Sequence, residues 1–496
     1  MFLKSLGAKI LAKRATKKIQ KWASNPIEIQ QKTFQSLIAE AKNTSFGEDH
    51  NFQQIKTYSD FVKQVPVRDY EGLKDYFKRT ANGEENVLWK GKPTYIAKTS
   101  GTTSGAKYIP ITKQSMPFHI EATKNALFCY IQETGNVDFV NGKMIFLQGS
   151  PELELKNGIN IGRLSGIVAH FVPKYLQKNR MPSWETNCID NWETKVDAIV
   201  KETKNENMTL IGGIPSWVQM YYEKLQKETH LKVGELFKNL QLFVYGGVNY
   251  EPYRTKFEEM IGRRIDSIEL YPASEGFFAF QDSQKEKGML LLLNSGIFYE
   301  FIETSKFYEE NPKRLIIGEV EIGVNYVMII STNAGLWGYN IGDTVQFTST
   351  KPYRVIVSGR IKHFISAFGE HVIGKEVEQA INEAMQKFQF SISEFTVAPQ
   401  INPTKDELPY HEWLIEFQTA PKNLIEIAAF MDKSMRNQNT YYKDLIEGKV
   451  LQPLRISSLK DDSFNAYMKS QGKLGGQNKV PRLSDNRKIA DQLLGL

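Results

Sequence analysis

The sequence has little of what several classes of protein require. Its 496 residues include two cysteines, Cys129 and Cys188, and seven scattered histidines with no H-E-x-x-H motif. Two isolated thiols provide neither a disulfide framework nor the ligand spacing of a zinc site. No apolar stretch reaches the roughly 20 residues of a membrane-spanning helix. We therefore expect a protein of the reducing cytoplasm.

Excess charge of one sign is confined to the start of the chain. The net charge is +7, and residues 1–27 contain seven Lys or Arg and no acidic residue, so they account for the whole excess. The balanced remainder argues against a nucleic-acid-binding protein. Lysines interrupt every apolar run in this segment, so we expect no signal peptide.

Within the basic segment, Leu11, Ala15, Ile19 and Trp22 recur at helical spacing. This pattern fits a basic amphipathic helix that contacts an anionic membrane surface through residues 1–22. It also fits a helix docked on its own protein through these four side chains. We favour the docked helix, because such stripes usually face a core.

The order of predicted elements indicates an α/β protein with a smaller second domain. Residues 28–80 have helical periodicity, with Ser59 or Asp60 as a candidate N-cap. From about residue 95 to 345, strand-like runs alternate with helical segments, which is typical of α/β domains. We predict a large multi-sheet N-terminal domain over 1–359 and a small, mobile α+β C-terminal domain over 360–496.

A segment rich in hydroxyl side chains, TSGTTSG at residues 99–105, lies between two strand-like runs. Glycine lets backbone N–H groups approach a ligand, and Ser or Thr adds short donors, a combination suited to phosphate oxygens. The segment is not a Walker A loop, because its glycines are one residue too close and Tyr108 follows Lys107. Composition alone also fits a hairpin turn.

Three further segments carry residues that fit a nucleotide site. LFVYGG ends in Gly246 and Gly247, where a flat ring could approach the backbone. IELYPASEGF places the ring of Tyr271 and the carboxylate of Glu275 after a strand. YNIGD ends in Asp343, whose carboxylate can accept hydrogen bonds from both hydroxyls of a ribose. Read singly, each segment also fits a turn.

In this order the segments resemble the motifs of the GH3 family of acyl-acid amido synthetases, a branch of the adenylate-forming ligases that include acyl-CoA synthetases and firefly luciferase. TSGTTSGAKYIP is similar to S-S-G-T-S-x-G-x-x-K-x-x-P, YPASE to Tyr-x-x-Ser-Glu, and YNIGD to Tyr-x-x-Gly-Asp. VPVRDYEGLKDY is similar to the family's opening. The resemblance spans nearly the whole chain and implies the adenylate-forming ligase fold, with ATP, Mg²⁺ and AMP as a product.

The resemblance implies a role for each matching residue. Lys107 would add charge at the phosphates, Glu275 would hold Mg²⁺, and Lys479 in GGQNKVPRL would be the mobile catalytic lysine. Lys362 in SGRIKHFI would be the hinge pivot. The predicted nucleotide-binding set is Ser100, Gly101, Thr102, Thr103, Ser104, Gly105, Gly246, Gly247, Val248, Tyr271, Ser274, Asp343 and Arg360.

The chain also departs from the family pattern. Plant members usually carry Arg in Tyr-Arg-Val-Gly-Asp, where this chain has Asn340, and Gly338 precedes the motif, so a positive charge near the nucleotide is missing. His170 and Trp217 lie in segments that suit an acyl-acid pocket, although structural roles also explain both. No histidine is assigned as the base that deprotonates the acceptor.

The predicted function is ATP-dependent activation of a carboxylic acid as an acyl-adenylate, followed by acyl transfer to an amino acid or another amine. A thioester ligase that uses the same adenylate is the nearest alternative. A non-catalytic nucleotide-binding protein is the third possibility, because a fold alone does not establish a function.

Overall fold

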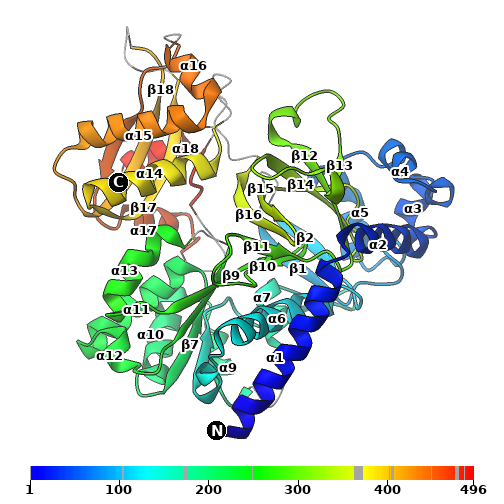
Figure 1. Ribbon diagram of the computed structural model, residues 1–496, viewed down its shortest axis with the longest axis horizontal. Coiled ribbons are helices and arrows are strands. Elements are labelled where there is room, and N and C mark those ends of the chain that lie inside the picture. The colour runs from blue at the N-terminus through cyan, green and yellow to red at the C-terminus, as the bar shows by residue number, and fades with distance from the viewer. Residues whose placement is uncertain are drawn as a thin grey trace. The chain divides into compact units, whose positions relative to one another are not determined.

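The computed structural model describes residues 2–102, 105–172, 177–247, 250–361, 372–401, 403, 407–447, 450–474, 480–484 and 486–495. The chain forms two compact units (Figure 1). The first comprises Met1–Tyr250, Phe257–Ile341 and Gln346–Ile356, and the second comprises Glu251–Lys256, Gly342–Val345 and Val357–Leu496. The predicted domain division at residue 359 stays a prediction. Among the described residues, no helix has the length and apolar character needed to cross a membrane.

The largest sheet contains strands from the middle of the chain. Its strands are β3 (Lys143–Phe146), β6 (Arg180–Met181), β7 (Met208–Gly212), β8 (Leu242–Gly246), β9 (Asp266–Ala273), β10 (Gly276–Phe280), β11 (Met289–Leu291), β12 (Ile297–Glu303), β13 (Leu315–Ile316), β14 (Asn325–Thr332), β15 (Tyr339–Thr350) and β16 (Tyr353–Arg360). Their order is β13-β12-β14-β15-β16-β11-β10-β9-β8-β7-β3-β6. Strands β6, β3, β7, β8 and β9 are parallel, whereas β9, β10, β11 and β16 are antiparallel neighbours.

Helices surround the sheets. They include α1 (Phe2–Ala23), α2 (Pro26–Ala41), α3 (Ser45–Asp49), α4 (Tyr58–Gln64), α5 (Lys74–Ala81), α6 (Met116–Thr134), α7 (Leu164–Ala169), α9 (Trp184–Asn187), α10 (Trp192–Thr203), α11 (Pro215–Thr229), α12 (Val233–Leu236) and α13 (Glu251–Ile261). On β8, Leu242 and Val244 share a hydrophobic core with α6 and α1. The alternate residue Phe243 contacts Phe257 of α13 with ring centroids 5.3 Å apart. Because successive strand side chains point to opposite faces, helices cover β8 on both sides.

A second sheet has the order β2-β1-β5-β4. It consists of β1 (Tyr95–Thr102), β2 (Gly105–Ile111), β4 (Glu154–Lys156) and β5 (Ile159–Gly162). The hydroxyl-rich segment lies in the β1–β2 hairpin, so the two strand-like runs predicted around it are strands.

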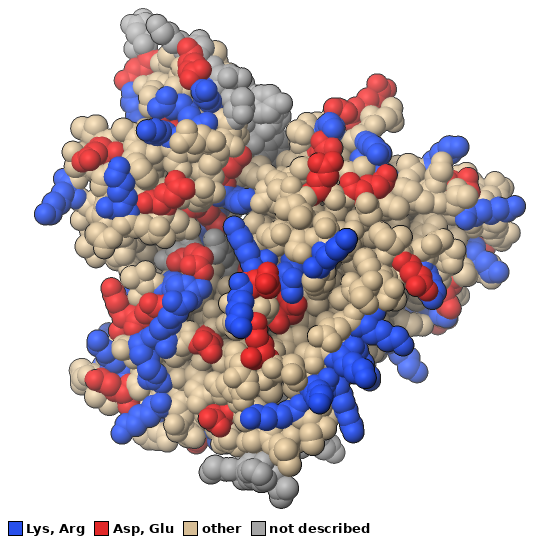
Figure 2. Space-filling model, viewed as in Figure 1, with Lys and Arg blue, Asp and Glu red and all other residues tan. Residues whose placement is uncertain are grey.

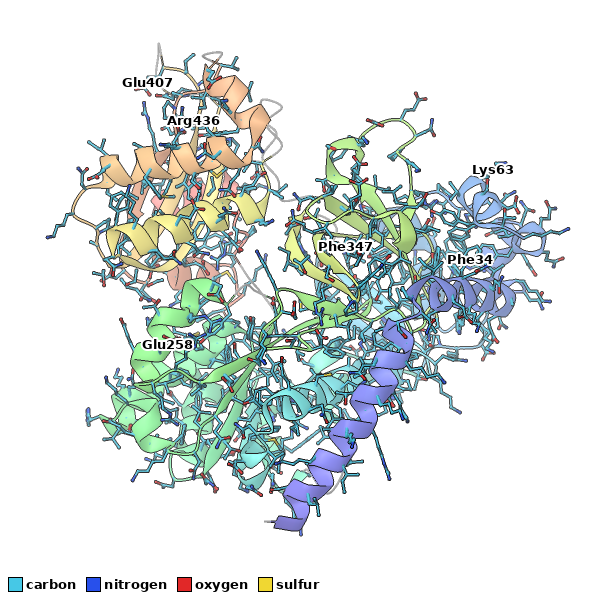
Figure 3. The ribbon with its side chains drawn as sticks, in the orientation of Figure 1. Phe34, Lys63, Glu258, Phe347, Glu407 and Arg436 are labelled. Carbon is cyan, nitrogen blue, oxygen red and sulfur yellow. The ribbon has the colours of Figure 1, made fainter. Side chains whose placement is uncertain are left out.

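The amino-terminal helices dock on the large sheet. The buried side chain of Gln30 on α2 donates to the carbonyls of Leu293 and Ile297 and accepts from the N–H of Tyr299. Phe34 of the same helix, labelled in Figure 3, lies 5.0 Å from the ring of Phe298. A buried amide with all three bonds made fixes α2 against β12 without leaving an unpaired polar group.

Two details of the predicted helices are wrong. The helix docks on its own protein as favoured, with Ile19 buried and Trp22 partly buried in the core that includes Ala122 and Ala126 of α6, but Leu11 is 52% exposed and Ala12 is buried in its place. The small alanine side chains allow the two helices to approach closely, whereas Leu11 would hold them apart. The N-cap of α4 is Thr57 rather than Ser59 or Asp60, in a capping box in which the side chain of Asp60 accepts from the Thr57 N–H.

The second unit contains a small α+β fold. Its sheet has the order β17-β18-β19, with β17 (Ser391–Gln400), β18 (Tyr410–Thr419) and β19 (Arg455–Leu459). Its helices include α14 (Gly374–Phe388), α15 (Leu424–Gln438), α16 (Thr440–Glu447), α17 (Ser463–Ser470) and α18 (Lys488–Leu494). Trp413 and Ile415 of β18 pack with Ile381 of α14 and Met431 of α15 in one core. The predicted α+β character of this region is confirmed.

Candidate nucleotide-binding site

The hydroxyl-rich motif occupies a β-hairpin rather than a long loop. Thr99 pairs with Lys107 and Thr102 with Gly105, and the register shifts between these two pairs. Strand structure therefore continues to Thr102, further than the sequence predicted. Such irregularities re-aim the backbone near functional sites. Thr103 and Ser104 lie outside the described residues, as do the side chains of residues 100–106.

Tyr70 holds the strand that follows this motif. The N–H of Tyr108 donates to the Tyr70 hydroxyl at 3.1 Å, and Lys107 Nζ lies 5.8 Å from the Tyr70 ring centroid. Burial raises the pKa of Tyr70, so its hydroxyl remains a neutral acceptor. The Tyr70 ring stacks on Phe77 with centroids 4.7 Å apart. Sequence reasoning missed Tyr70, whose segment was noted only for its resemblance to the family's opening.

Phe77 connects Tyr70 to the third motif, and the third motif contacts the second. The rings of Phe77 and Tyr339 lie edge to face, with centroids 6.1 Å apart. The Tyr339 hydroxyl donates to Glu275 Oε1 at 3.5 Å. Burial, followed by the charge of Glu275, raises the pKa of Tyr339 well above its ordinary value, so a neutral phenol faces the carboxylate. One series of contacts thus joins all three motifs.

The backbone of residues 66–70 pairs with the third motif. The Arg68 N–H donates to the Gly338 carbonyl at 3.1 Å, and the Asn340 N–H donates to the Arg68 carbonyl at 2.8 Å. Gly338 has φ 53°, and a Cβ there would lie 3.0 Å from the Pro66 carbonyl oxygen. A side chain would be strained and crowded at this position. Gly338, a departure from the family pattern, is therefore the residue that lets this segment approach β15.

A buried ion pair supports the same region. Arg314 donates from Nε and Nη2 to the two carboxylate oxygens of Glu300, at 2.8 and 2.7 Å, and from Nη1 to the carbonyl of Val65 at 2.5 Å. The Tyr58 hydroxyl donates to Glu300 as well, at 2.8 Å. Bidentate geometry and the additional bonds compensate the two buried charges.

The second motif lies at the carboxyl edge of the parallel strands. β8 and β9 are parallel, so Gly247 and the Ser274–Glu275 turn both follow strands that end at one edge of the sheet. Ligands of open α/β sheets bind at this edge. Tyr271 is buried near the end of β9, with its ring 5.1 Å from that of Phe278.

The backbone geometry after β8 by itself requires the two glycines of this segment. A Cβ at Gly246 would lie 2.6 Å from the Leu270 carbonyl oxygen, and Gly247 has φ 78°. Both positions need glycine whether or not a ring approaches them. Val248 lies outside the described residues.

Asp343 and Arg360, both predicted to bind the nucleotide, form an ion pair in the second unit. Arg360 Nε lies 2.8 Å from Asp343 Oδ1, and the guanidinium side chain is 58% exposed while the carboxylate is buried. The Ile361 N–H donates to the Gly342 carbonyl at 2.7 Å, which ties the two strands together. Lys362 and Lys479 lie outside the described residues.

Three family models match the chain. They are the GH3 family N-terminal domain over residues 15–188, the GH3 family central domain over 290–360 and the GH3 family C-terminal domain over 375–488. The chain belongs to the GH3 family. The resemblance that rested on three short motifs is confirmed.

Curated GH3 relatives are distant in sequence. A jasmonoyl–L-amino acid synthetase of Nicotiana attenuata is 23% identical over 392 residues, which cover 64% of this chain and 66% of the relative. The indole-3-acetic acid-amido synthetase GH3.3 of Arabidopsis thaliana is 23% identical over 568 residues, which cover 95% of this chain and 91% of the relative.

Solved structures share the fold of this GH3 chain. The GH3.15 acyl acid amido synthetase in complex with 2,4-DB has a TM-score of 0.78 at 17% identity, covering 98% of this chain and 96% of that one. A 2-hydroxyisobutyryl-CoA ligase in its postadenylation state has a TM-score of 0.57 at 13% identity, covering 94% and 92%. The predicted adenylate-forming ligase fold is confirmed.

Two residues predicted for the acyl pocket of this GH3 protein make structural contacts. Trp217 is buried on α11, with its ring 4.6 Å from that of Trp192 on α10. His170 is exposed at the end of α7, with Nε2 2.9 Å from the Pro151 carbonyl oxygen and the ring 4.9 Å from Trp184. Trp217 therefore packs two helices together, and acyl binding by either residue stays a prediction.

Proposed function

We propose that this protein uses ATP to activate a carboxylic acid as its acyl-adenylate and then transfers the acyl group to an amino acid. A carboxylate oxygen attacks the α-phosphorus, the bond to the β-phosphate oxygen breaks, and pyrophosphate leaves. The neutral amine then attacks the acyl carbon, AMP leaves with the electron pair of the mixed anhydride bond, and the amine loses a proton. The product is an amide.

The observation that carries this proposal is the contact series from Lys107 through Tyr70, Phe77 and Tyr339 to Glu275. Residues of three motifs that are far apart in the chain occupy one region of the first unit. An activating site needs donors and cations at the phosphates and a carboxylate for a metal, and this region provides both kinds of group. The named amido synthetases among the GH3 relatives support the same chemistry.

The residues of the hairpin and of β2 would bind the triphosphate. Backbone N–H groups near Gly101 and Gly105 would donate to phosphate oxygens, and Lys107 would offset their charge. Its ammonium lies beside the Tyr70 ring face, which favours a cation without neutralising it. Gly247 and Tyr271 would border the adenine, and Asp343 would accept from the ribose hydroxyls. Lys479 would reach the phosphates during adenylation.

The donor set fits Mg²⁺ as a companion of the nucleotide. Among the described residues, no group of three or more His, Cys, Asp or Glu could hold a metal by itself. Mg²⁺ commonly takes one or two carboxylates and completes its shell with substrate phosphates and water, so Glu275 suffices as the protein ligand. When bound, the ion would orient the phosphates and lower the charge repulsion during transfer. The Tyr339 hydroxyl, 3.5 Å from Glu275 Oε1, would help to orient this carboxylate.

The acceptor is an amino acid in this proposal, because the GH3 relatives are named for amino acid conjugation. The rival is a thioester ligase, favoured by the fold shared with a CoA ligase, although that likeness is the weaker of the two. We place the reaction in the cytoplasm, where the free thiols of Cys129 and Cys188 remain reduced.

The first experiment measures acid-dependent pyrophosphate release. The folded protein is incubated with ATP, Mg²⁺ and a panel of aliphatic and aromatic carboxylic acids. We expect release with at least one acid, and its loss in Glu275→Ala. Glu286→Ala is the control, since Glu286 is an exposed carboxylate outside the motifs. Near-native release by a folded Glu275→Ala protein would remove Glu275 from the mechanism.

The second experiment identifies the acceptor. Twenty amino acids and, separately, CoA are added to the reaction with the active acid, and products are identified by mass. An amide supports the proposal, and a CoA thioester without amide establishes the rival function. If the protein neither binds ATP nor releases pyrophosphate with any acid, the proposed activity is wrong. The protein would then share only its fold with the amido synthetases of the family.

A further inference from the structure

Helix α1 presents a continuous basic arc to solvent. At 100° per residue, the exposed side chains occupy one side of the helix, opposite the buried Ala12 and Ile19. The basic members of this arc are Lys9, Lys13, Arg14, Lys17, Lys18 and Lys21, and all are exposed. Figure 2 shows the Lys and Arg side chains gathered along α1 at the lower right of the view.

In the part of the chain that the structure describes, the arc has no acidic counterpart. None of its six cations forms an ion pair with a described residue, and the helix itself contains no Asp or Glu. The total charge of +7 equals the seven basic residues before residue 28, so the charges of the remaining chain sum to zero. The positive field is therefore local to α1.

The amino-terminal half of the same helix also exposes apolar side chains. Leu6 is 46%, Ile10 47% and Leu11 52% exposed. Leu6 and Ile10 are four residues apart and therefore lie on one side of the helix. Large exposed apolar groups within a basic arc are the features that let a helix lie in the interface of a bilayer.

We propose that α1 binds the protein to the surface of an anionic phospholipid bilayer, with Leu6, Ile10 and Leu11 inserted at the headgroup boundary and the six basic side chains on lipid phosphates and carboxylates. The opposite, alanine-rich side stays docked on α6, so binding requires no unfolding of the helix from its core. A nucleic acid would complement the basic charge but would leave the three apolar side chains without a partner. An anionic lipid surface accommodates both the basic and the apolar side chains.

The expected strength follows from the number of basic residues. Each Lys or Arg near an anionic surface increases binding roughly fivefold. Replacing three of them should therefore weaken binding roughly a hundredfold, and raising the salt concentration should do the same progressively, because the Debye length shortens. Binding that changes with charge but not with the apolar side chains would point to a polyanion other than lipid.

The test is cosedimentation of the full-length protein with vesicles of phosphatidylcholine alone or with 30% phosphatidylserine. We expect binding only to the anionic vesicles, a roughly hundredfold loss in Lys13→Gln/Lys17→Gln/Lys18→Gln, and a clear loss in Leu6→Ser/Ile10→Ser. The charge-matched control replaces Lys56, Lys63 and Lys78 with Gln. These lysines are exposed on the first unit outside α1, and Lys63 is labelled on α4 in Figure 3.

The outcomes separate the possible occupants. Equal losses in the α1 variant and in the control variant would overturn the proposal, because only net charge would then matter. Binding of a 20-base-pair DNA duplex or of tRNA more tightly than of the anionic vesicles at the same ionic strength would also overturn it. All variants should keep the circular dichroism spectrum and the acid-dependent pyrophosphate release of the parent protein, since α1 contains none of the proposed site residues.

Discussion

Replacing Tyr70 with Phe tests whether the contact between Tyr70 and β2 positions the proposed phosphate site. The substitution removes one oxygen, the acceptor of the 3.1 Å bond from the Tyr108 N–H. It keeps the ring that stacks on Phe77 and lies beneath Lys107. The perturbation is therefore confined to one hydrogen bond, next to the residue predicted to meet the phosphates.

The size of the effect follows from that bond. A neutral hydrogen bond contributes about 1 kcal/mol net, and a buried donor left unpaired costs about 1–3 kcal/mol. We expect the free energy of unfolding to fall by about 1 kcal/mol, because the bond is only partly buried and water can replace the lost hydroxyl. We expect the rate of acid-dependent pyrophosphate release to fall roughly tenfold, since a displacement well below 1 Å at reacting groups already lowers rates.

The assay is steady-state pyrophosphate release at saturating acid with varied ATP, together with urea unfolding. Tyr76→Phe is the matched control, because the Tyr76 hydroxyl donates to Asp49 at 2.6 Å at an exposed position and touches none of the motifs. Tyr70→Leu, which also removes the ring, should lower the rate further and raise KM for ATP. Equal rates in Tyr70→Phe, Tyr76→Phe and the parent protein would refute a positioning role for Tyr70.

Three further outcomes follow from the structure. Asp343→Ala should abolish acid-dependent pyrophosphate release while leaving the protein folded, which the same assay and circular dichroism check; release above a tenth of the parent rate would argue against ribose binding by Asp343. Arg314→Met leaves the fully buried Glu300 charge unpaired and should lower the free energy of unfolding by about 3–5 kcal/mol in urea, with partial recovery in Arg314→Met/Glu300→Leu. Burial lowers the pKa of Lys195 from its ordinary value of 10.5 to about 8. Between these two pH values the unfolded chain therefore binds more protons than the folded protein, and the free energy of unfolding should rise with pH by about 3 kcal/mol. Lys195→Gln, measured over the same pH range, should lack the rise that Lys195 adds; an identical pH dependence in both proteins would contradict it.

The order of the motifs made the site partly predictable. The residues of each motif are neighbours in the chain, and their types are suited to phosphate, metal and ribose, so Glu275 and Asp343 could be named before any contact was known. Strands and helices in the middle of the chain were equally accessible, because period-2 and period-3.6 patterns are local. The family match then confirmed what the motifs indicated.

Residues that join the motifs could not be found in this way. Tyr70 and Phe77 contact Tyr108 and Tyr339 across long stretches of chain, and nothing in the local pattern around them distinguishes a positioning tyrosine from a core tyrosine. Gly338 looked like a departure from the family, and its reason lies in the approach of the Pro66 carbonyl from another segment. Contacts between distant segments depend on packing, which periodicity does not encode.

The sequence by itself determined the family, the fold class and the chemical character of the candidate site, because these depend on residue types in short, ordered segments. Only the tertiary structure decided which side of α1 faces solvent, where Ala12 rather than Leu11 packs on α6 and six cations are left exposed. It also decided that Tyr339 meets Glu275 and that the buried Lys195 ammonium donates to the carbonyls of Gln148 and Asn187. Burial and contact are properties of the packed chain, since they depend on which surfaces exclude water together.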